Sequence, residues 1–438
     1  MKTKFLFIAL LMGATAFAQN NSEKQNSPLK FNLNKDGTHW VKATFLSQIW
    51  LRETQTNPGS TVFYEPVDNV FDIGLRRTRL QLMGQITDKV FFYTQFGLNN
   101  FHYTSARYAG AFFHDAIIEY EVAKRAVTIG GGLTGWSGLT RYASPSIGKI
   151  MSLDAPLYQQ ATNGASDQFV RKLSVYAKGK IGKLDYRMAL TKPMTIQTAV
   201  APIAPLSTRS DYSLKPPKTQ YQGYFMYQFK DEESNKTPYT PGTYLGTKSV
   251  FNIGTGIIYQ PDAMWHLNGT DTVSSVLMLF GFDVFYDAPI NAEKGNAITV
   301  YAAYTYYDYG PNYTRNVGVM NPANGVNTNG TFSGAGNSFT MVGTGSTIYA
   351  QVGYLFGKDF LPKGRLQPYF ASQLGLYERL ADNMLMFETG VNWYLNGRHN
   401  EKLSFNYQNR PVHDFEPNGD VVQVERKGMF TLQFQIAI

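Results

Sequence analysis

Alternation of apolar and polar residues constrains the fold most strongly, and it is clearest in the last segment of the chain, GMFTLQFQIAI. Every second position carries an apolar side chain, and the positions between carry Thr, Gln or Ala: Phe430, Leu432, Phe434, Ile436 and Ile438 alternate with Thr431, Gln433, Gln435 and Ala437. Successive side chains of a β-strand point to opposite faces, so this segment has an apolar face and an uncharged polar face. Both a half-buried edge strand of a soluble sheet and a strand of a membrane barrel fit this pattern.

The first residues predict export. Lys2 and Lys4 precede the apolar run FLFIALLMGATAF, and Ala16-Phe17-Ala18 offers a small-x-small cleavage site. This is the anatomy of a secretory signal peptide, so residues 1–18 are predicted to be removed, leaving a polar N-terminal segment over 19–38.

Composition then narrows the class of an exported chain. No later run of about 18 apolar residues is present that could form a transmembrane helix. Charged residues make up only 16%, aromatic residues reach 15%, and the chain has no cysteine. These features together indicate a transmembrane β-barrel. The net charge of +8 comes from dispersed Lys and Arg, which does not favour nucleic-acid binding.

Segments of roughly ten residues with alternating polarity recur along the whole chain, as barrel strands require. The alternation predicts about sixteen strands, near 40–52, 70–86, 90–101, 112–121, 126–133, 169–179, 184–191, 220–230, 249–260, 274–286, 297–308, 346–356, 364–376, 384–395, 402–411 and 427–438. The predicted fold is therefore all-β, a single antiparallel transmembrane β-barrel spanning 39–438.

The connections between these segments alternate in length. Short turns at 87–89, 181–183 and 396–401 alternate with long segments that are rich in Pro, Gly, Asn and Ser. The long segments lie near 53–69, 134–168, 192–219, 309–345 and 412–426. If both termini are periplasmic, these long segments are extracellular loops. The segment 231–248 would then be an unusually long periplasmic turn, which counts against the strand register.

A soluble β-sandwich is the competing fold. Sandwich strands average five or six residues and usually expose charged side chains, whereas these strands are longer and their second face is mostly Gln, Asn, Thr, Tyr and Gly. Several segments also have aromatic residues near their ends, as interface girdles do: Trp40, Trp50, Tyr354, Phe356, Trp393 and Tyr394. The barrel is favoured, and its final strand should pair with the first, because an open edge in lipid leaves backbone groups unpaired.

If the apolar positions face lipid, the alternate positions face the lumen. In RRTRLQLMGQI, Leu80 and Leu82 point outward, so Arg77 and Arg79 point inward. The same rule predicts these pore-lining basic residues: Lys42, Arg77, Arg79, Lys172, Lys178, Arg187 and Arg410. It also predicts lumen acids: Asp115, Glu119, Glu121, Asp283 and Glu388. The basic residues either select anions or form ion pairs that brace the wall, and the alternation alone leaves both readings open.

The segment 134–168 is long for its position. A barrel of about sixteen strands has a water-filled bore, which an inward-folded loop commonly narrows. In that arrangement Arg141, Ser144, Ser146 and Lys149 would be the constriction groups. The alternative is an external cap over the mouth.

Motifs for enzymes are weak. GGGLTG at 130–135 matches G-x-G-x-x-G, but a loop follows it instead of the helix that a dinucleotide site requires. The six histidines are not spaced as metal ligands. We therefore expect no catalytic residue, no metal site and no cofactor.

Three stretches give a resemblance to a known family. FDIGLRRTRLQLMGQITDKVFFYTQFGLNN (71–100), HDAIIEYEVAKRAVTIGGGLTGWSGL (114–139) and ETGVNWYLNGRHNEKLSFNYQNR (388–410) resemble the phosphate-selective porin family of outer-membrane channels. The resemblance implies a sixteen-stranded porin, commonly trimeric, that passes small anions down a concentration gradient. Arg77 and Arg79 match the arginine-rich strand of the family. The third loop offers only Arg141 and Lys149, without the lysine cluster of phosphate-selective members.

The prediction is thus a passive channel of the bacterial outer membrane for small hydrophilic solutes and ions, with weak to moderate anion preference. Its expected partners are outer-membrane lipid, the barrel-insertion machinery and two further copies in a homotrimer. The alternatives are a pore selective for phosphate, a carboxylate or a sugar, and a non-conducting barrel acting as scaffold or enzyme. An open bore would favour the channel, and a lumen blocked by loops would favour the non-conducting barrel.

Overall fold

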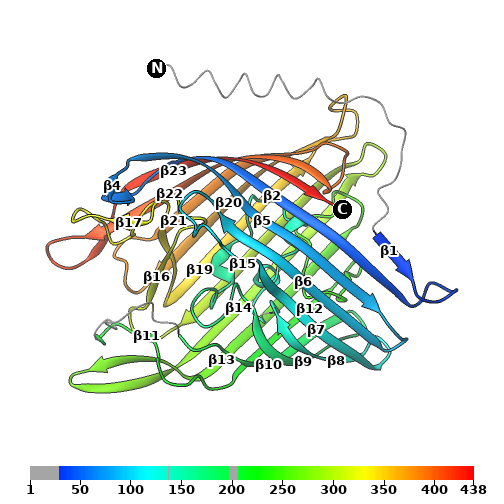
Figure 1. Cartoon of the computed structure of the whole chain (residues 1–438), viewed down its shortest axis with the longest axis horizontal. Coiled ribbons are helices and arrows are strands. Elements are labelled where there is room, and N and C mark those ends of the chain that lie inside the picture. Colours follow the sequence, from blue (N-terminus) through cyan, green and yellow to red (C-terminus); the bar gives the residue numbers. More distant parts are fainter. Residues whose placement is uncertain (1–28, 137, 197–205) are drawn as a thin grey trace.

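The computed structural model describes residues 29–136, 138–196 and 206–438. The predicted signal peptide, 1–18, lies outside the described residues. In the described part of the chain, sixteen strands each pair antiparallel with the next to form a barrel (Figure 1). They are β2 (Trp40–Gln55), β5 (Asn69–Gln85), β6 (Val90–Phe101), β7 (Phe112–Ala123), β8 (Val127–Thr134), β9 (Lys172–Ile181), β10 (Leu184–Lys192), β12 (Gln220–Gln228), β13 (Val250–Asn268), β14 (Asp271–Asn291), β15 (Asn296–Asp308), β19 (Gly345–Leu355), β20 (Arg365–Tyr377), β21 (Met384–Tyr394), β22 (Glu401–Phe415) and β23 (Val421–Ala437).

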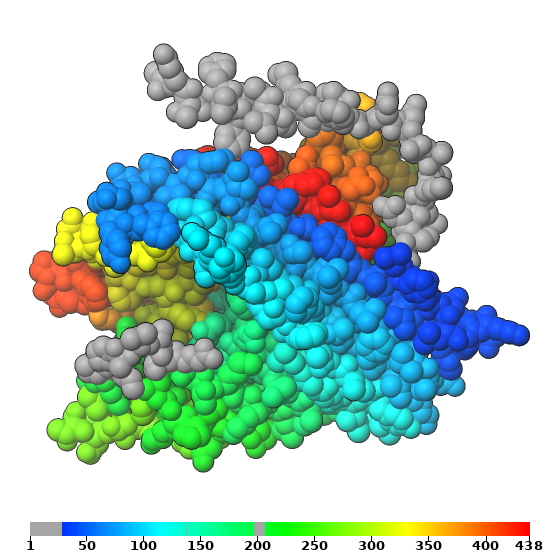
Figure 2. Space-filling model, viewed as in Figure 1, coloured from blue at the N-terminus to red at the C-terminus, as the bar shows by residue number. Residues whose placement is uncertain are grey.

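The last strand closes the barrel on the first. β23 pairs with β2 from Leu46↔Ala437 to Thr54↔Met429. In Figure 2 the blue N-terminal strand and the red C-terminal strand accordingly lie side by side on the outer wall. Closure leaves no unpaired edge along the wall, which an apolar surrounding would penalise. The predicted all-β closed barrel is confirmed.

Alternation sorts the side chains of the terminal strand as expected. Phe430 is 46% exposed and Ile436 is 38% exposed on the outer face, whereas Gln433 and Gln435 on the inner face are fully buried. The same pattern runs round the wall, where Leu80, Leu82, Val175 and Phe282 are also exposed outward.

All sixteen predicted segments coincide with barrel strands, but two hairpins are longer than predicted. The predicted long segment 412–426 is wrong, because β22 runs to Phe415 and β23 begins at Val421. β13 and β14 continue past the predicted limits of 260 and 274 and meet at a turn after Asn268. This hairpin projects beyond the rest of the barrel, at the lower left of Figure 1. A bulge between Gln260 and Met264 shifts its register, which interrupts the strict alternation that the prediction relied on.

Two of the aromatic residues predicted for interface girdles point inward instead. Trp50 is buried and donates from Nε1 to Gln433 Oε1 at 2.8 Å. Tyr394 is buried and its hydroxyl donates to Gln367 Oε1 at 2.6 Å. Both residues lie at the alternate positions whose side chains face the lumen. Alternation therefore predicted the direction of these side chains better than position near a strand end did.

The connections define two ends of the barrel. The short-turn end carries turns such as 86–89 and 182–183, and the long-loop end carries 56–68, 135–171, 193–219 and 309–344. The N-terminal segment and the connections also contain short strands: β1 (Leu29–Asn32), β3 (Ser60–Val62), β4 (Glu65–Pro66), β11 (Asp211–Tyr212), β16 (Thr314–Val317), β17 (Gly325–Val326) and β18 (Phe339–Gly343). Three 3-10 turns lie in the connection 135–171: η2 (Arg141–Ala143), η3 (Ile147–Lys149) and η4 (Leu157–Gln159). Strand β1 was not predicted; it pairs with the start of β2. Among the described residues we find no helix with the length and apolar character needed to span a membrane.

Candidate functional site in the barrel interior

The loop between β8 and β9, which contains the predicted constriction segment 134–168, lies inside the barrel. Side chains of three wall strands donate to its backbone: Gln48 Nε2 to Ile147 O at 3.2 Å, Asn392 Nδ2 to Met151 O at 2.7 Å, and Gln435 Nε2 to Gly148 O at 2.9 Å. These donors belong to β2, β21 and β23. Buried backbone carbonyls need hydrogen-bond donors. The polar side chains on the inner face of the wall supply these donors and so hold the loop in place.

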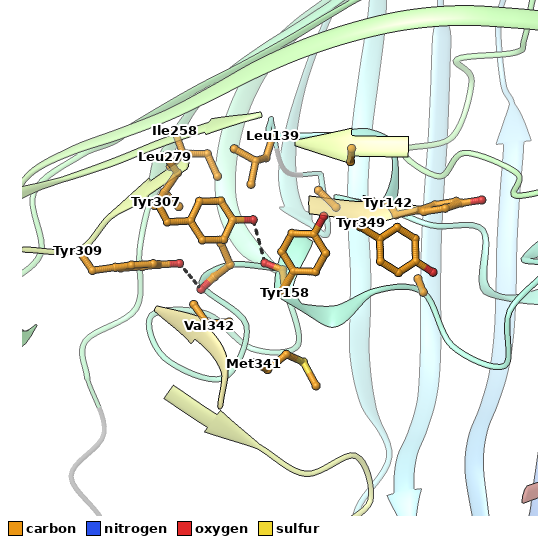
Figure 3. Close-up of a cluster of buried hydrophobic side chains, with 14 of the residues drawn as sticks. Leu139, Tyr142, Tyr158, Ile258, Leu279, Tyr307, Tyr309, Met341, Val342 and Tyr349 are labelled. Atoms are coloured by element: carbon orange, nitrogen blue, oxygen red, sulfur yellow. Dashed lines mark hydrogen bonds between the residues drawn. The ribbon is translucent and has the colours of Figure 1, made fainter. Parts of the chain in front are cut away.

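Tyrosines of the opposite wall hold the far side of the loop (Figure 3). Tyr307 and Tyr309 donate from their hydroxyls to the carbonyls of Tyr158 and Ala161 at 2.9 and 3.0 Å. The hydroxyl of Tyr301 reaches Gln159 Oε1 at 2.9 Å. The cluster buries large rings while each of these hydroxyls keeps a hydrogen bond, which is the usual condition for burying tyrosine.

Glycines in the wall let the loop backbone approach closely. A Cβ on Gly256 of β13 would lie 2.4 Å from the carbonyl oxygen of Leu139, and a Cβ on Gly281 of β14 would lie 2.6 Å from the same atom. Only glycine fits at such contacts, because real Cβ atoms do not come this near to an oxygen.

A bulge in β5 brings two adjacent arginines into the lumen. In the pairing of β2 with β5, Gln48 faces Arg77 and Ile49 faces Leu75, so Arg76 is the extra residue. Arg76 and Arg77 both bind Asp154 of the loop, with N–O distances of 3.0 and 2.5 Å. Burial alone would raise the pKa of the Asp154 carboxyl, but the two guanidinium groups hold it below its usual range. Strict alternation predicted Arg77 and missed Arg76.

A second segment enters the barrel from the short-turn end. Residues 229–249, which join β12 to β13, form the long turn expected over 231–248 and fold inward to meet the β8–β9 loop. Their backbones pair directly: Ser146 N donates to Thr240 O at 2.8 Å, Thr240 N donates to Ser144 O at 3.0 Å, and Gly242 N donates to Lys149 O at 2.9 Å. The unusual length of this turn therefore reflects an inward segment and not a wrong register.

A buried ion pair joins the two inward segments. Arg141 of the loop donates from Nη1 and Nη2 to the two carboxylate oxygens of Glu233 at 2.6 and 2.5 Å. Their side chains are 1% and 3% exposed. Burial opposes ionisation of Glu233, but Arg141 keeps the pKa of this carboxyl below its ordinary value.

The basic residues predicted to line the pore all lie on the inner side of the wall, and most are buried by contacts. Lys178 pairs with Glu119 at 2.7 Å, Lys172 lies 3.7 Å from Asp167, and Arg187 lies 3.5 Å from Asp185. Arg79 and Arg410 are also buried and donate to backbone carbonyls, of Leu98 and Gln55 respectively. Alternation could place these residues, but it could not show which loop atoms they meet.

The lumen acids are likewise satisfied. Asp283 accepts from Tyr224 at 2.9 Å and from the backbone of Arg141, and Asp115 accepts from Tyr239 at 2.5 Å. Glu388 accepts from Asn406 at 3.1 Å. In the described part of the chain, no group of three or more His, Cys, Asp or Glu side chains is placed to hold a metal ion.

Three lysines at the short-turn end differ from this buried set. Lys149 and Lys236 are exposed and Lys42 is half-buried. None of the three forms an ion pair within the described residues. Desolvation by the surrounding protein and, to a lesser extent, the charge of Lys42 lower the pKa of Lys149. Lys236, which sequence reasoning missed, lies 5.4 Å from the ring of Trp40, two residues from Lys42.

The remaining constriction candidates sit at the junction of the two inward segments. Ser144 is buried and donates to Gly135 O at 2.6 Å, and Ser146 is half-buried. Beside this junction is a small cavity between the wall and the 229–249 segment, lined by Glu119, Trp136, Tyr176, Lys178, Arg187, Thr237 and Pro238. Arg141, Ser144, Ser146 and Lys149 all contact residues 240–242 of the second inward segment.

Comparison with solved structures supports the architecture. OprB of Pseudomonas putida matches with a TM-score of 0.51 at 10% identity, over 90% of this chain and 94% of that chain. OmpT, an outer membrane protein of Vibrio cholerae, matches at 10% identity over 93% and 99% with a TM-score of 0.49. The outer membrane channel DcaP of Acinetobacter baumannii matches at 13% identity over 91% and 97%, also with a TM-score of 0.49. No protein-family model and no curated protein matches the sequence. At 10% identity, the likeness to OprB shows the fold alone.

Proposed function

We propose that the protein is a porin-like diffusion channel of the bacterial outer membrane for small hydrophilic solutes and ions. The closed barrel carries this proposal, because it presents apolar side chains outward on every strand and polar side chains inward. An apolar outer surface suits a lipid bilayer. A closed barrel also leaves no backbone group of its wall unpaired within the bilayer. The trimeric assembly implied by the family resemblance belongs to the same proposal.

Uptake by proteoliposomes tests the transport activity. Vesicles containing the protein are expected to swell in an isosmotic solution of a small uncharged solute and to swell more slowly as solute size increases. Vesicles reconstituted with heat-denatured protein provide the control. Equal swelling rates in the two preparations would contradict the channel.

We further propose a modest anion preference that arises at the short-turn end. The buried cations of the wall are enclosed by carboxylate or carbonyl partners, whereas Lys42, Lys149 and Lys236 are half-buried or exposed and form no ion pair within the described residues. Uncompensated cations at a pore entrance raise the local concentration of anions. The motifs that resemble phosphate-selective porins would imply a preference for phosphate, because arginine binds phosphate through two hydrogen bonds. Arg77 is already paired with Asp154, so we do not propose phosphate specificity.

Neutralising two of these three lysines is expected to weaken the preference. In Lys42→Gln/Lys149→Gln, the chloride-to-potassium permeability ratio should fall towards 1, since two of the three charges that attract chloride are gone. The reversal potential in a KCl gradient measures this ratio. Lys363→Gln, at an exposed position in the turn between β19 and β20, should leave it unchanged. An unchanged ratio in the double variant would locate the selectivity elsewhere.

A non-conducting barrel is the second candidate, and a specific observation favours it. Two segments from opposite ends meet in the lumen, and the side chains of Arg52, Lys402 and Arg410 on the inner wall are fully buried. A barrel filled in this way could serve as a scaffold. The swelling assay separates the two candidates, because a scaffold would not pass solute.

A further inference from the structure

We propose that residues 229–249 form a removable plug of the channel and that the Arg141–Glu233 ion pair is its latch. This inference rests on the proposed channel function. The segment enters from the end of the barrel where the other connections are short, and it adds a barrier distinct from the β8–β9 loop.

The plug spans the bore from one wall to the other. On one side Lys178 donates to Asn235 O at 2.7 Å and Arg187 donates to Pro238 O at 2.9 Å. Across the bore, His399 Nε2 in the turn between β21 and β22 lies 3.1 Å from Thr243 O, and the Thr243 hydroxyl lies 3.1 Å from that of Thr299 on β15. A segment anchored to both walls obstructs the passage between them.

These anchors are mostly hydrogen bonds to the plug's own backbone, and the apolar packing of the plug is limited to buried Leu245 and half-buried Tyr239 and Tyr244. Such contacts can be exchanged for water when a segment moves, so the plug belongs to the low-stability class of elements. The β8–β9 loop differs, because it packs Leu139, Tyr142 and Tyr158 into the main hydrophobic cluster. The plug is therefore the inward segment that can leave, and the loop is the one that stays.

The latch is the strongest contact between them. Glu233 accepts from both terminal nitrogens of Arg141, from the hydroxyl of Tyr244 at 2.5 Å and from Asn252. Arg141 also donates from Nη2 to Pro241 O at 2.6 Å within the plug, and its guanidinium lies 3.6 Å from the Phe285 ring. Loss of the Glu233 charge leaves Arg141 buried without a counter-charge, which favours hydration of the junction and release of the plug.

Single-channel recording of Glu233→Gln tests the latch. The unitary conductance is expected to rise by about twofold or more over the unmodified protein, because a released plug widens the narrowest section. Glu293→Gln is the matched control, since Glu293 is exposed in the turn between β14 and β15, outside the plug. Its conductance should equal that of the unmodified protein. Glu233→Asp is a second variant, for use if Glu233→Gln does not fold. Aspartate keeps the charge but is too short to reach both nitrogens of Arg141, so the conductance should again rise.

A reversible cross-link tests that the change comes from movement of the plug. The chain has no cysteine, so a pair can be introduced without interference. Pro145 and Thr240 are bridge partners across the junction, which places them within the range that a disulfide requires. In the Glu233 variant that also carries Pro145→Cys and Thr240→Cys, oxidation should return the conductance to the unmodified level and a reductant should raise it again.

Two results would overturn the plug. One is a conductance in both Glu233 variants equal to that of the unmodified protein. The other is a raised conductance that oxidation of the cysteine pair does not change. Absence of current from every folded protein, the unmodified chain included, would instead overturn the channel function on which the inference rests.

Discussion

Replacing Asp72 by Ala is expected to lower the free energy of unfolding by about 3–5 kcal/mol, the largest effect we anticipate for a single side chain. Arg52 donates from Nε and Nη2 to the two oxygens of Asp72 at 2.8 and 2.6 Å, and both side chains are 0% exposed. Arg52 also donates to the carbonyls of Val319 and Met320 at 2.8 and 2.5 Å, so it holds the 309–344 loop against the wall. The substitution leaves a buried guanidinium without its counter-charge. Urea unfolding in lipid vesicles measures the change.

The double variant Arg52→Met/Asp72→Leu is the control for this prediction. Removing both charges avoids the buried unpaired ion, so the loss should be well below that of Asp72→Ala. If the single and the double variant unfold at the same urea concentration, the ion pair does not explain the effect.

Leu80→Arg is expected to destabilise the barrel by about 2–4 kcal/mol if this part of β5 lies near the bilayer midplane. Leu80 is 58% exposed on the outer face, so the substitution would place a charge among lipid chains. Its neighbour Gln81 faces the lumen and accepts from Thr44 Oγ1 at 2.8 Å. Gln81→Arg should cost about 1 kcal/mol or less, since this position is only half-buried. Equal costs at the two positions in the same urea experiment would contradict the assignment of outer and inner faces.

The barrel itself could be predicted from the sequence because its wall obeys one local rule. Every second side chain of a strand faces the same side, so Phe430 and Gln433 reveal their faces without knowledge of any partner strand. The rule failed where the backbone departs from regular pleating. The bulge at Arg76 turns two consecutive arginines inward, and the bulge after Gln260 carries β13 beyond its predicted end.

The contents of the lumen could be predicted less well, for a physical reason. Whether Lys178 or Arg141 faces water or a carboxylate depends on contacts between residues far apart in the chain, such as Arg141 with Glu233. Alternation carries no information about those contacts. The length of the 231–248 segment was the one sequence feature that pointed to an inward segment, since connections between neighbouring strands are usually much shorter. Its inward path became visible only in the three-dimensional arrangement.

The channel assignment is tested most directly by single-channel current through the purified, folded protein in a planar bilayer under a KCl gradient. We expect stable conductance steps with a reversal potential that favours chloride, reflecting Lys42 and Lys149 at the short-turn end. Conductance steps with a reversal potential that favours potassium would support the channel function and contradict the proposed role of the lysines in selectivity. A bilayer that contains correctly folded protein and carries no current would contradict the channel and leave the filled barrel as a scaffold.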